Sequence, residues 1–182
     1  MRFILLPVLA LAMPAMAAPQ AWTVVPAASS ITFSGTHAGS PFSGKFGQWA
    51  AQIAFDPADL PHSSARVTIA TASGKTGDGL RDTSLTQDDW FDPAHFPRAT
   101  FVTSKISAAG PDRYVADGVL TIKGKAVPVK LPFTLKIVGA TATMNGSVAV
   151  DRLAFGMGAQ ADPQGAFVSK QISLKIAVTA KK

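Results

Sequence analysis

The amino-acid sequence predicts an all-β fold: a single up-and-down antiparallel β-barrel of about eight strands, with a short helical insertion around residues 78–95. The main observation is the stretch KAVPVKLPFTLKI, residues 125–137, in which apolar residues hold every second position from Val127 to Ile137. A period of two indicates a strand with one buried face. At about 3.3 Å per residue it would extend roughly 36 Å, about twice the usual length. So long a twisted strand favours a closed barrel over a sandwich.

Shorter segments show the same alternation. Strands are predicted over residues 22–25, 31–34, 48–55, 66–71, 100–106, 114–123 and 172–179. Within residues 141–150, Asn145-Gly146 predicts a hairpin turn. Residues 35–44 combine Gly, His and Pro, which is typical of a loop. The helical insertion is predicted as one short helix over residues 80–85 and a further turn of helix over residues 88–93.

The first residues predict a secretory signal peptide. Met1-Arg2 gives a positive start, an apolar run follows to Met16, and Ala15-Met16-Ala17 fits a small-x-small cleavage site. The apolar run is too short, and too interrupted by prolines, for a membrane-spanning helix. We therefore expect cleavage after Ala17, a mature domain of residues 18–182, and a periplasmic location without stable membrane insertion.

Composition excludes several classes of function. The sequence has no cysteine, which excludes disulfides, thiolate metal sites and thiol catalysis. The formal net charge is +6, but only 15% of residues are charged and the lysines occur singly. Nucleic-acid binding requires clustered basic residues with interleaved aromatics, so no nucleic-acid partner is expected.

No metal or catalytic motif is present in the sequence. His37, His62 and His95 lack the spacing of metal ligands. The acidic cluster at residues 88–92 contains Trp90 and Phe91, which favours a turn that docks its aromatic rings on the barrel over a cation site. No nucleophile elbow or S-x-x-K motif is present. We therefore expect a non-enzymatic protein without a metal or cofactor.

Four blocks of the sequence resemble the YceI-like family, whose members are exported, lipocalin-like, polyisoprenoid-binding barrels. The blocks are ITFSGTHAGSPFSGKFGQWAAQIAFDP (31–57), GLRDTSLTQDDWFDPAHFPRATF (79–101), GVLTIKGKAVPVKLPFTL (118–135) and DRLAFGMG (151–158). They occur in order and cover nearly all of the mature chain. One departure is Ala154, where the family usually carries an acidic residue, so Arg152 is expected to lack that neighbour.

The resemblance implies an elongated hydrophobic pocket that holds an isoprenoid quinone tail, a polyprenyl diphosphate or a related long-chain lipid. Burying methylenes contributes about 0.8 kcal/mol each, so micromolar affinity requires few polar contacts. The expected lining residues are the apolar members of the strands: Phe33, Trp49, Ile53, Ile69, Phe101, Leu120, Ile122, Phe133, Leu135, Phe155, Leu174 and Ile176. His37 and Arg152 are the candidates for contact with the head group of the lipid.

Two other classes of function stay open at this point. A small outer-membrane barrel has the same alternation, with its apolar residues facing outward. An enzyme that modifies a lipid could use the same pocket, although no acid or base beside it can be identified. The identity of the lipid, a membrane enzyme or redox partner, and pairing of two barrels as a homodimer also stay open.

Overall fold

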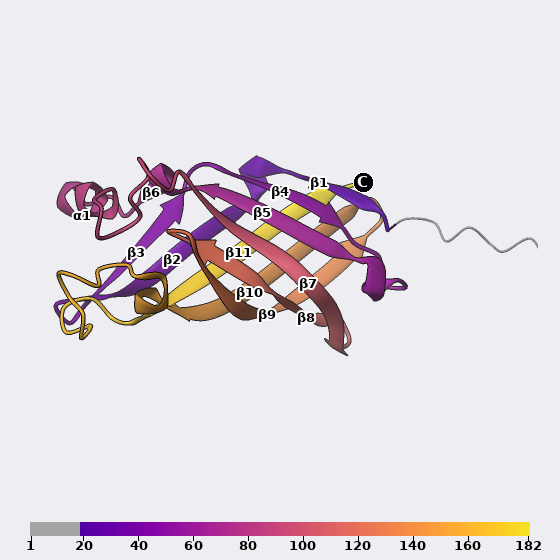
Figure 1. Ribbon diagram of the computed structural model, residues 1–182. Helices are drawn as coiled ribbons and strands as arrows, with labels where there is room; N and C mark the ends of the chain where they lie inside the picture. Colours follow the sequence, from indigo (N-terminus) through magenta and orange to yellow (C-terminus); the bar gives the residue numbers. More distant parts are fainter. Residues whose placement is uncertain (1–18) are drawn as a thin grey trace, which may run out of the picture.

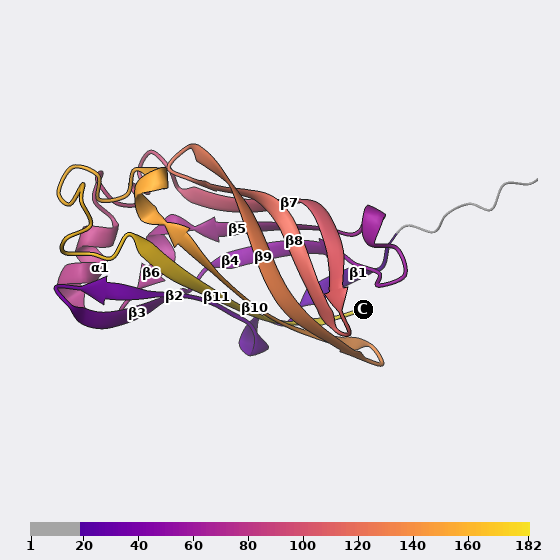
Figure 2. The ribbon, with the colours of Figure 1, turned by 90° about the horizontal axis from the view of Figure 1, so that it is seen from below.

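The computed structural model describes residues 19–182, and the predicted signal peptide lies outside the described residues. Within the described residues, eleven strands form one sheet that curls into a barrel (Figures 1 and 2). The strands are β1 (Ala21–Val24), β2 (Ser30–His37), β3 (Ser40–Phe46), β4 (Trp49–Ala54), β5 (Ser64–Ala70), β6 (Gly74–Lys75), β7 (Arg98–Gly110), β8 (Arg113–Ile122), β9 (Lys125–Val138), β10 (Thr141–Asp151) and β11 (Gln171–Lys181). The helices are α1 (Gly79–Leu85) and the 3₁₀ turns η1 (Pro26–Ala28), η2 (Leu60–His62), η3 (Thr71–Ser73) and η4 (Arg152–Phe155).

The sheet closes because β1 pairs with both β4 and β11. The closed order is β1-β4-β5-β7-β8-β9-β10-β11 and back to β1, eight strands in all, with antiparallel pairing throughout. Strand β2 follows β1 along the same edge of β11 after η1, and β3 leads through Gly47-Gln48 into β4. The predicted barrel of about eight antiparallel strands is confirmed.

The long predicted strand is β9, which runs for 14 residues between β8 and β10. Its inward side chains include Leu131 and Leu135, which are buried, while Lys130, Thr134 and Lys136 are exposed. Successive side chains of a strand point to opposite faces, so this alternation places the apolar face inside the barrel.

The hairpin predicted at Asn145-Gly146 is wrong. Strand β10 runs straight through these residues, and Gly146 pairs with Phe133 on one side and Ile176 on the other. A Cβ atom at Gly146 would lie 3.1 Å from Leu131 Cδ1 and 3.2 Å from Phe133 Cβ, so glycine here accommodates the packing of β9. The turn between β9 and β10 instead lies at Gly139-Ala140.

A loop prediction and a helix prediction also need correction. Most of residues 35–44 belong to the β2–β3 hairpin, whose turn is Ala38-Gly39 with φ of +48° and +78°. Positive φ at both central residues is the geometry of a type I′ turn, which matches the twist of the flanking strands. Helix α1 confirms the helix predicted over residues 80–85, but residues 88–93 form hydrogen-bonded turns with no helix.

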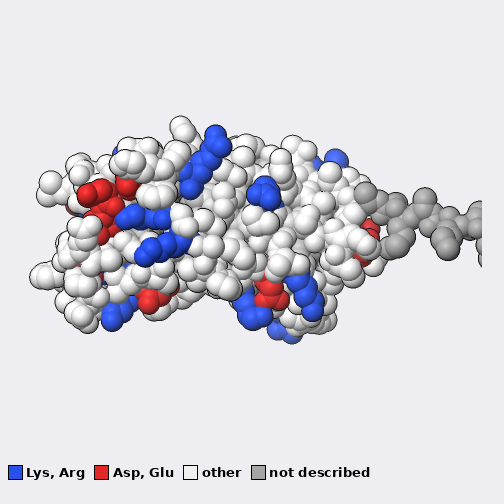
Figure 3. Space-filling model, viewed as in Figure 1, with Lys and Arg blue, Asp and Glu red and all other residues white. Residues whose placement is uncertain are grey.

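One end of the barrel carries α1, the β2–β3 turn and the segment 152–170, and we call it the capped end (Figure 1). The opposite end holds the C-terminus, where Lys182 N–H donates to Ala140 O at 3.1 Å. On the face seen in Figure 3, Lys and Arg side chains are spread over the surface and acidic side chains gather near α1. The buried core divides into two clusters, one of them with Phe46, Phe91 and Phe155 and the other with Trp22 and Phe55.

Candidate functional site

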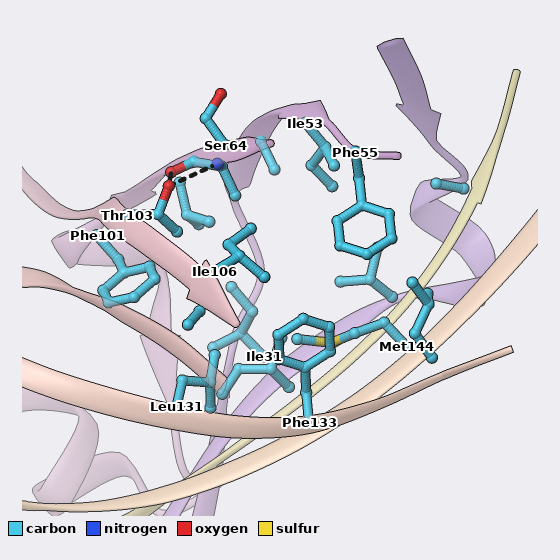
Figure 4. Close-up of a pocket in the computed structure, with 18 of the residues that line it drawn as sticks. Ile31, Ile53, Phe55, Ser64, Phe101, Thr103, Ile106, Leu131, Phe133 and Met144 are labelled. Carbon is cyan, nitrogen blue, oxygen red and sulfur yellow. Dashed lines mark hydrogen bonds between the residues drawn. The ribbon is translucent and has the colours of Figure 1, made fainter. Parts of the chain in front are cut away.

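The interior of the barrel contains a cavity of about 170 Å³, which we call the main cavity. Its labelled wall residues surround an empty centre in Figure 4. Among the 26 lining residues only Ser64 and Thr103 carry a polar group on the side chain, apart from the indole nitrogens of Trp22 and Trp49. The Thr103 hydroxyl is engaged with the backbone of Ala65, 2.9 Å from its nitrogen and 3.2 Å from its oxygen, and the Ser64 hydroxyl points away from the cavity (Figure 4). The space is therefore almost wholly apolar.

A second cavity of about 90 Å³, the small cavity, adjoins the main cavity toward the capped end. Four residues line both cavities: Ile31, Ile69, Leu120 and Leu174. Along β11, the lining runs from Ile172 in the small cavity to Ala180 in the main cavity. At about 3.3 Å per residue that stretch measures roughly 26 Å. The two apolar cavities therefore lie one after the other along β11.

The twelve residues predicted to line a pocket all lie on these two cavities. The main cavity is lined by nine of them: Trp49, Ile53, Ile69, Phe101, Leu120, Phe133, Leu135, Leu174 and Ile176. Phe33, Ile122 and Phe155 line the small cavity only. Their contact with a ligand stays a prediction.

Sequence reasoning missed the small residues that create the space. Ala116, Ala142 and Ala180 are 4%, 7% and 3% exposed and line the main cavity. Each occupies an inward position of its strand, so the alternation of apolar and polar residues is the one signal in the sequence that could have located it. Alanine does not mark a strand face as leucine does, so the sequence pattern does not single these positions out.

Arg152 and Asp162 are the two buried charged residues of the described chain, at 2% and 6% exposure. The Arg152 guanidinium donates to Asp162 Oδ2 at 2.7 Å, and also to the backbone oxygens of Met157, Asp162 and Val168 at 2.6, 3.1 and 3.0 Å. The ring of Trp90 lies 5.5 Å from Arg152 Cζ. Arg152 thus ties together the segment 152–168 on the capped end.

Position 154 carries no acid, but Arg152 does not lack an acidic partner, because its guanidinium pairs with Asp162. Arg152 lines the small cavity, and its buried Nε–H has no hydrogen-bond partner within the described residues. His37 lies exposed at the end of β2, bridged to Val168, and lines neither cavity as described. The head-group roles of both residues stay predictions.

The acidic turn after α1 docks its aromatic rings on the barrel as predicted. Phe91 is 6% exposed and packs edge-on against Phe46, with ring centroids 5.7 Å apart. The carboxylate of Asp89 accepts from the backbone N–H groups of Gln160 and Ala161 at 3.0 and 2.9 Å. These contacts join the turn to the segment 152–170.

Three carboxylates of the capped end have pKa values below 3.8, their usual value. Backbone N–H donors are the main cause: Arg81 N–H lowers the pKa of Asp78, Thr76 N–H that of Asp82, and Val168 N–H that of Asp162. Hydrogen bonds to the ionised form favour ionisation.

Acid should loosen the capped end before the barrel. A carboxylate whose pKa is lower in the folded than in the unfolded protein stabilises the fold at pH values above its unfolded pKa, near 3.8. That stabilisation is lost as the pH falls through the lower pKa of the folded protein. Hydrogen exchange, corrected for its intrinsic pH dependence, should accelerate in α1 and residues 156–168 below pH 4 while β8 and β9 stay protected. Asp82→Asn should reduce this pH dependence in α1, where Asp78 still titrates, and should leave that of residues 156–168 unchanged. Uniform acceleration over all strands would contradict the prediction.

A model of the YceI-like domain matches residues 22–180, which is nearly all of the described chain. The chain belongs to the YceI-like family. A UPF0312 protein of Shewanella denitrificans is 32% identical over 104 residues, which are 57% of this chain and 54% of that protein. A UPF0312 protein of Pseudomonas syringae pv. syringae is 30% identical over 105 residues, 57% of this chain and 55% of that protein. The matches thus span just over half the length of these curated relatives.

Solved structures of YceI-like barrels superpose on this chain. The crystal structure of Burkholderia cenocepacia BcnA is 36% identical, with a TM-score of 0.83 over 87% of this chain and 99% of BcnA. The Campylobacter jejuni YCEI protein is 27% identical, with a TM-score of 0.67 over 76% of this chain and 84% of that one. A polyisoprenoid binding domain from Saccharophagus degradans is 11% identical, with a TM-score of 0.68 over 88% of this chain and 97% of that one, a likeness of fold.

Within residues 19–182, no helix combines the length and the apolar character needed to span a membrane. Nor do three histidine or acidic side chains of these residues gather where they could hold a metal ion.

Proposed function

We propose that this YceI-like protein is a periplasmic, non-enzymatic carrier that holds the apolar chain of a polyisoprenoid or related long-chain lipid inside its barrel. The observation that carries the proposal is the pair of adjoining cavities along β11, lined by side chains that offer methyl, methylene and aromatic contacts. An apolar chain gains about 0.8 kcal/mol for each methylene buried there. The polyisoprenoid binding domain from Saccharophagus degradans shares this fold, and its ligand class agrees with the proposal.

The charges of the interior restrict which part of a lipid it can hold. Among the described residues, Arg152 is the one charged residue that lines either cavity, and Asp162 already neutralises it. A diphosphate moved inside would meet no unpaired cation of the described chain, and burying an uncompensated anion is very costly. The cavities therefore suit the isoprenoid chain of either predicted ligand, a quinone or a polyprenyl diphosphate, and suit only a neutral head group.

The two alternatives receive less support. An outer-membrane barrel requires apolar residues on its outer face, whereas the outward positions of β9 include the exposed Lys130, Thr134 and Lys136. A lipid-modifying enzyme requires an acid or base beside the substrate. The described lining offers the neutralised Arg152 and no carboxylate or histidine.

Protein purified without detergent from its native host should carry a lipid that extracts into organic solvent, at close to one molecule per barrel. Mass spectrometry of the extract identifies the lipid. After extraction, decylubiquinone should quench the fluorescence of Trp22 and Trp49, which line the main cavity, with micromolar affinity. An extract without lipid, together with no quenching by decylubiquinone and no binding of geranylgeraniol, would contradict the carrier function.

A further inference from the structure

The wall of the barrel has a gap between the first two strands and β4. Strand β1 pairs with β4 only at Ala21–Ala54 and Trp22–Ile53, then leaves it to follow β11. Strand pairing on this side resumes at Thr32–Lys45 of the β2–β3 hairpin. Between these pairs, residues 23–31 face residues 46–52 with no strand pairing among the described residues. We call this gap the side slot.

The sequence explains why the slot forms. Pro26 lacks an N–H and stands at the start of η1, which projects from the barrel as the turn between β1 and β2 (Figure 2). Because η1 projects outward, the chain between β1 and β2 does not pair with β4. As a result, Trp49 to Gln52 of β4 pair with β5 on one side and with no strand of the described chain on the other.

Outside the slot lies a solvent-open groove of about 1260 Å³. Trp22, Trp49, Ala51 and Ile53 line both this groove and the main cavity. The groove and the cavity therefore meet at one stretch of wall, where β4 contributes small side chains such as Ala50 and Ala51.

The groove differs from the cavity in its polar groups and charge. Its lining includes Lys45 and Arg66 together with Gln48 and Gln52, and it includes no Asp or Glu. Neither cation forms an ion pair in the described part of the chain. A polar surface with two unneutralised cations complements an anionic group, which the interior cannot take.

We infer that the side slot is the entrance of the barrel: an amphiphile passes its apolar tail through the slot into the main cavity, and its anionic head group, such as a phosphate, rests in the groove near Lys45 and Arg66. This inference rests on the proposed lipid-carrier function and adds the route and the head-group site. It also reconciles an interior without free charge with a lipid that carries a diphosphate.

A reversible cross-link across the slot tests the route. The chain has no cysteine, so Thr23→Cys/Gln52→Cys supplies the only thiols. These exposed positions come next in register after the Trp22–Ile53 pair. A short bis-methanethiosulfonate should slow the uptake of geranylgeraniol at least tenfold, and dithiothreitol should restore it. The control is Thr134→Cys/Asn145→Cys, an exposed pair on the adjoining strands β9 and β10.

If the cross-linked slot variant takes up geranylgeraniol as fast as before cross-linking, the side slot is not the entrance. The carrier function would still stand. Failure of every variant and of the unmodified protein to bind geranylgeraniol would instead overturn the carrier function itself. The two failures are therefore distinguishable.

The charges of the groove are tested with two probes that share one tail. Lys45→Gln/Arg66→Gln should weaken the binding of geranylgeranyl diphosphate about tenfold and leave geranylgeraniol unchanged, since only the diphosphate meets the two cations. Lys136→Gln, an exposed cation on β9, is the control and should affect neither probe. Equal effects on both probes, or no effect on the diphosphate, would overturn the head-group site.

Discussion

Replacing Arg152 with methionine should lower the melting temperature by about 10 °C. Methionine preserves much of the side-chain volume but removes the charge, so Asp162 is left buried with no cation, and three backbone oxygens lose their donor. Removing one partner of a buried ion pair is strongly destabilising for this reason. Thermal unfolding followed by circular dichroism measures the effect.

Two further variants define the cause. Arg81→Met removes the partner of Asp78 at 3.3 Å, where both side chains are substantially exposed, and should change the melting temperature little. Arg152→Lys keeps the charge but cannot reproduce the fork of the guanidinium, so its melting temperature should lie between those of the wild type and Arg152→Met. Equal melting temperatures for Arg152→Met and Arg81→Met would show that the buried ion pair stabilises the fold no more than the exposed one.

Replacing Ala116 with phenylalanine should reduce lipid binding at least tenfold. Ala116 is 4% exposed and lines the main cavity from β8, so a phenyl ring there projects into a space of only about 170 Å³. The ring competes with the lipid chain for the same contacts. Titration with decylubiquinone, and the amount of lipid that copurifies, measure the loss.

Val119→Phe is the matched control for the cavity variant. Val119 lies three positions further along β8, faces outward and is 38% exposed. The same aromatic side chain there should leave lipid binding unchanged. If Ala116→Phe is folded by near-ultraviolet circular dichroism yet binds decylubiquinone as the wild type does, the lipid does not occupy the main cavity.

Most of the barrel could be predicted because apolar residues recur at every second position of each strand and so mark its inner face. Alternation located β9 to within a residue at each end, and it identified Leu131 and Leu135 as inward positions. It failed at Asn145-Gly146, where a strong local turn signal lies in the middle of β10. There the packing of Leu131 and Phe133 against Gly146 outweighs the local preference, and no short window of sequence contains those neighbours.

The site was predictable in chemistry but not in shape. The twelve predicted apolar positions lie on the inner face. The free space, however, depends on Ala116 and Ala142, and an alanine in a sequence does not indicate whether it faces the interior. The partner of Arg152 was missed for a similar reason, since Asp162 lies in a loop with no period to place it. The side slot follows from where β1 departs from β4, which is a property of pairing between distant strands.

The closure of the barrel has a consequence for how the protein folds. The closing contact joins Thr23 to Lys181, which are 181 − 23 = 158 positions apart in sequence. Contacts this distant are slow to form, because the entropy of loop closure is lost before the contact stabilises anything. Until β11 pairs with β1, the nascent sheet has two bare edges and an uncovered apolar face, a state prone to association with other chains. A chain that lacks Gln171–Lys181 would be held in that state.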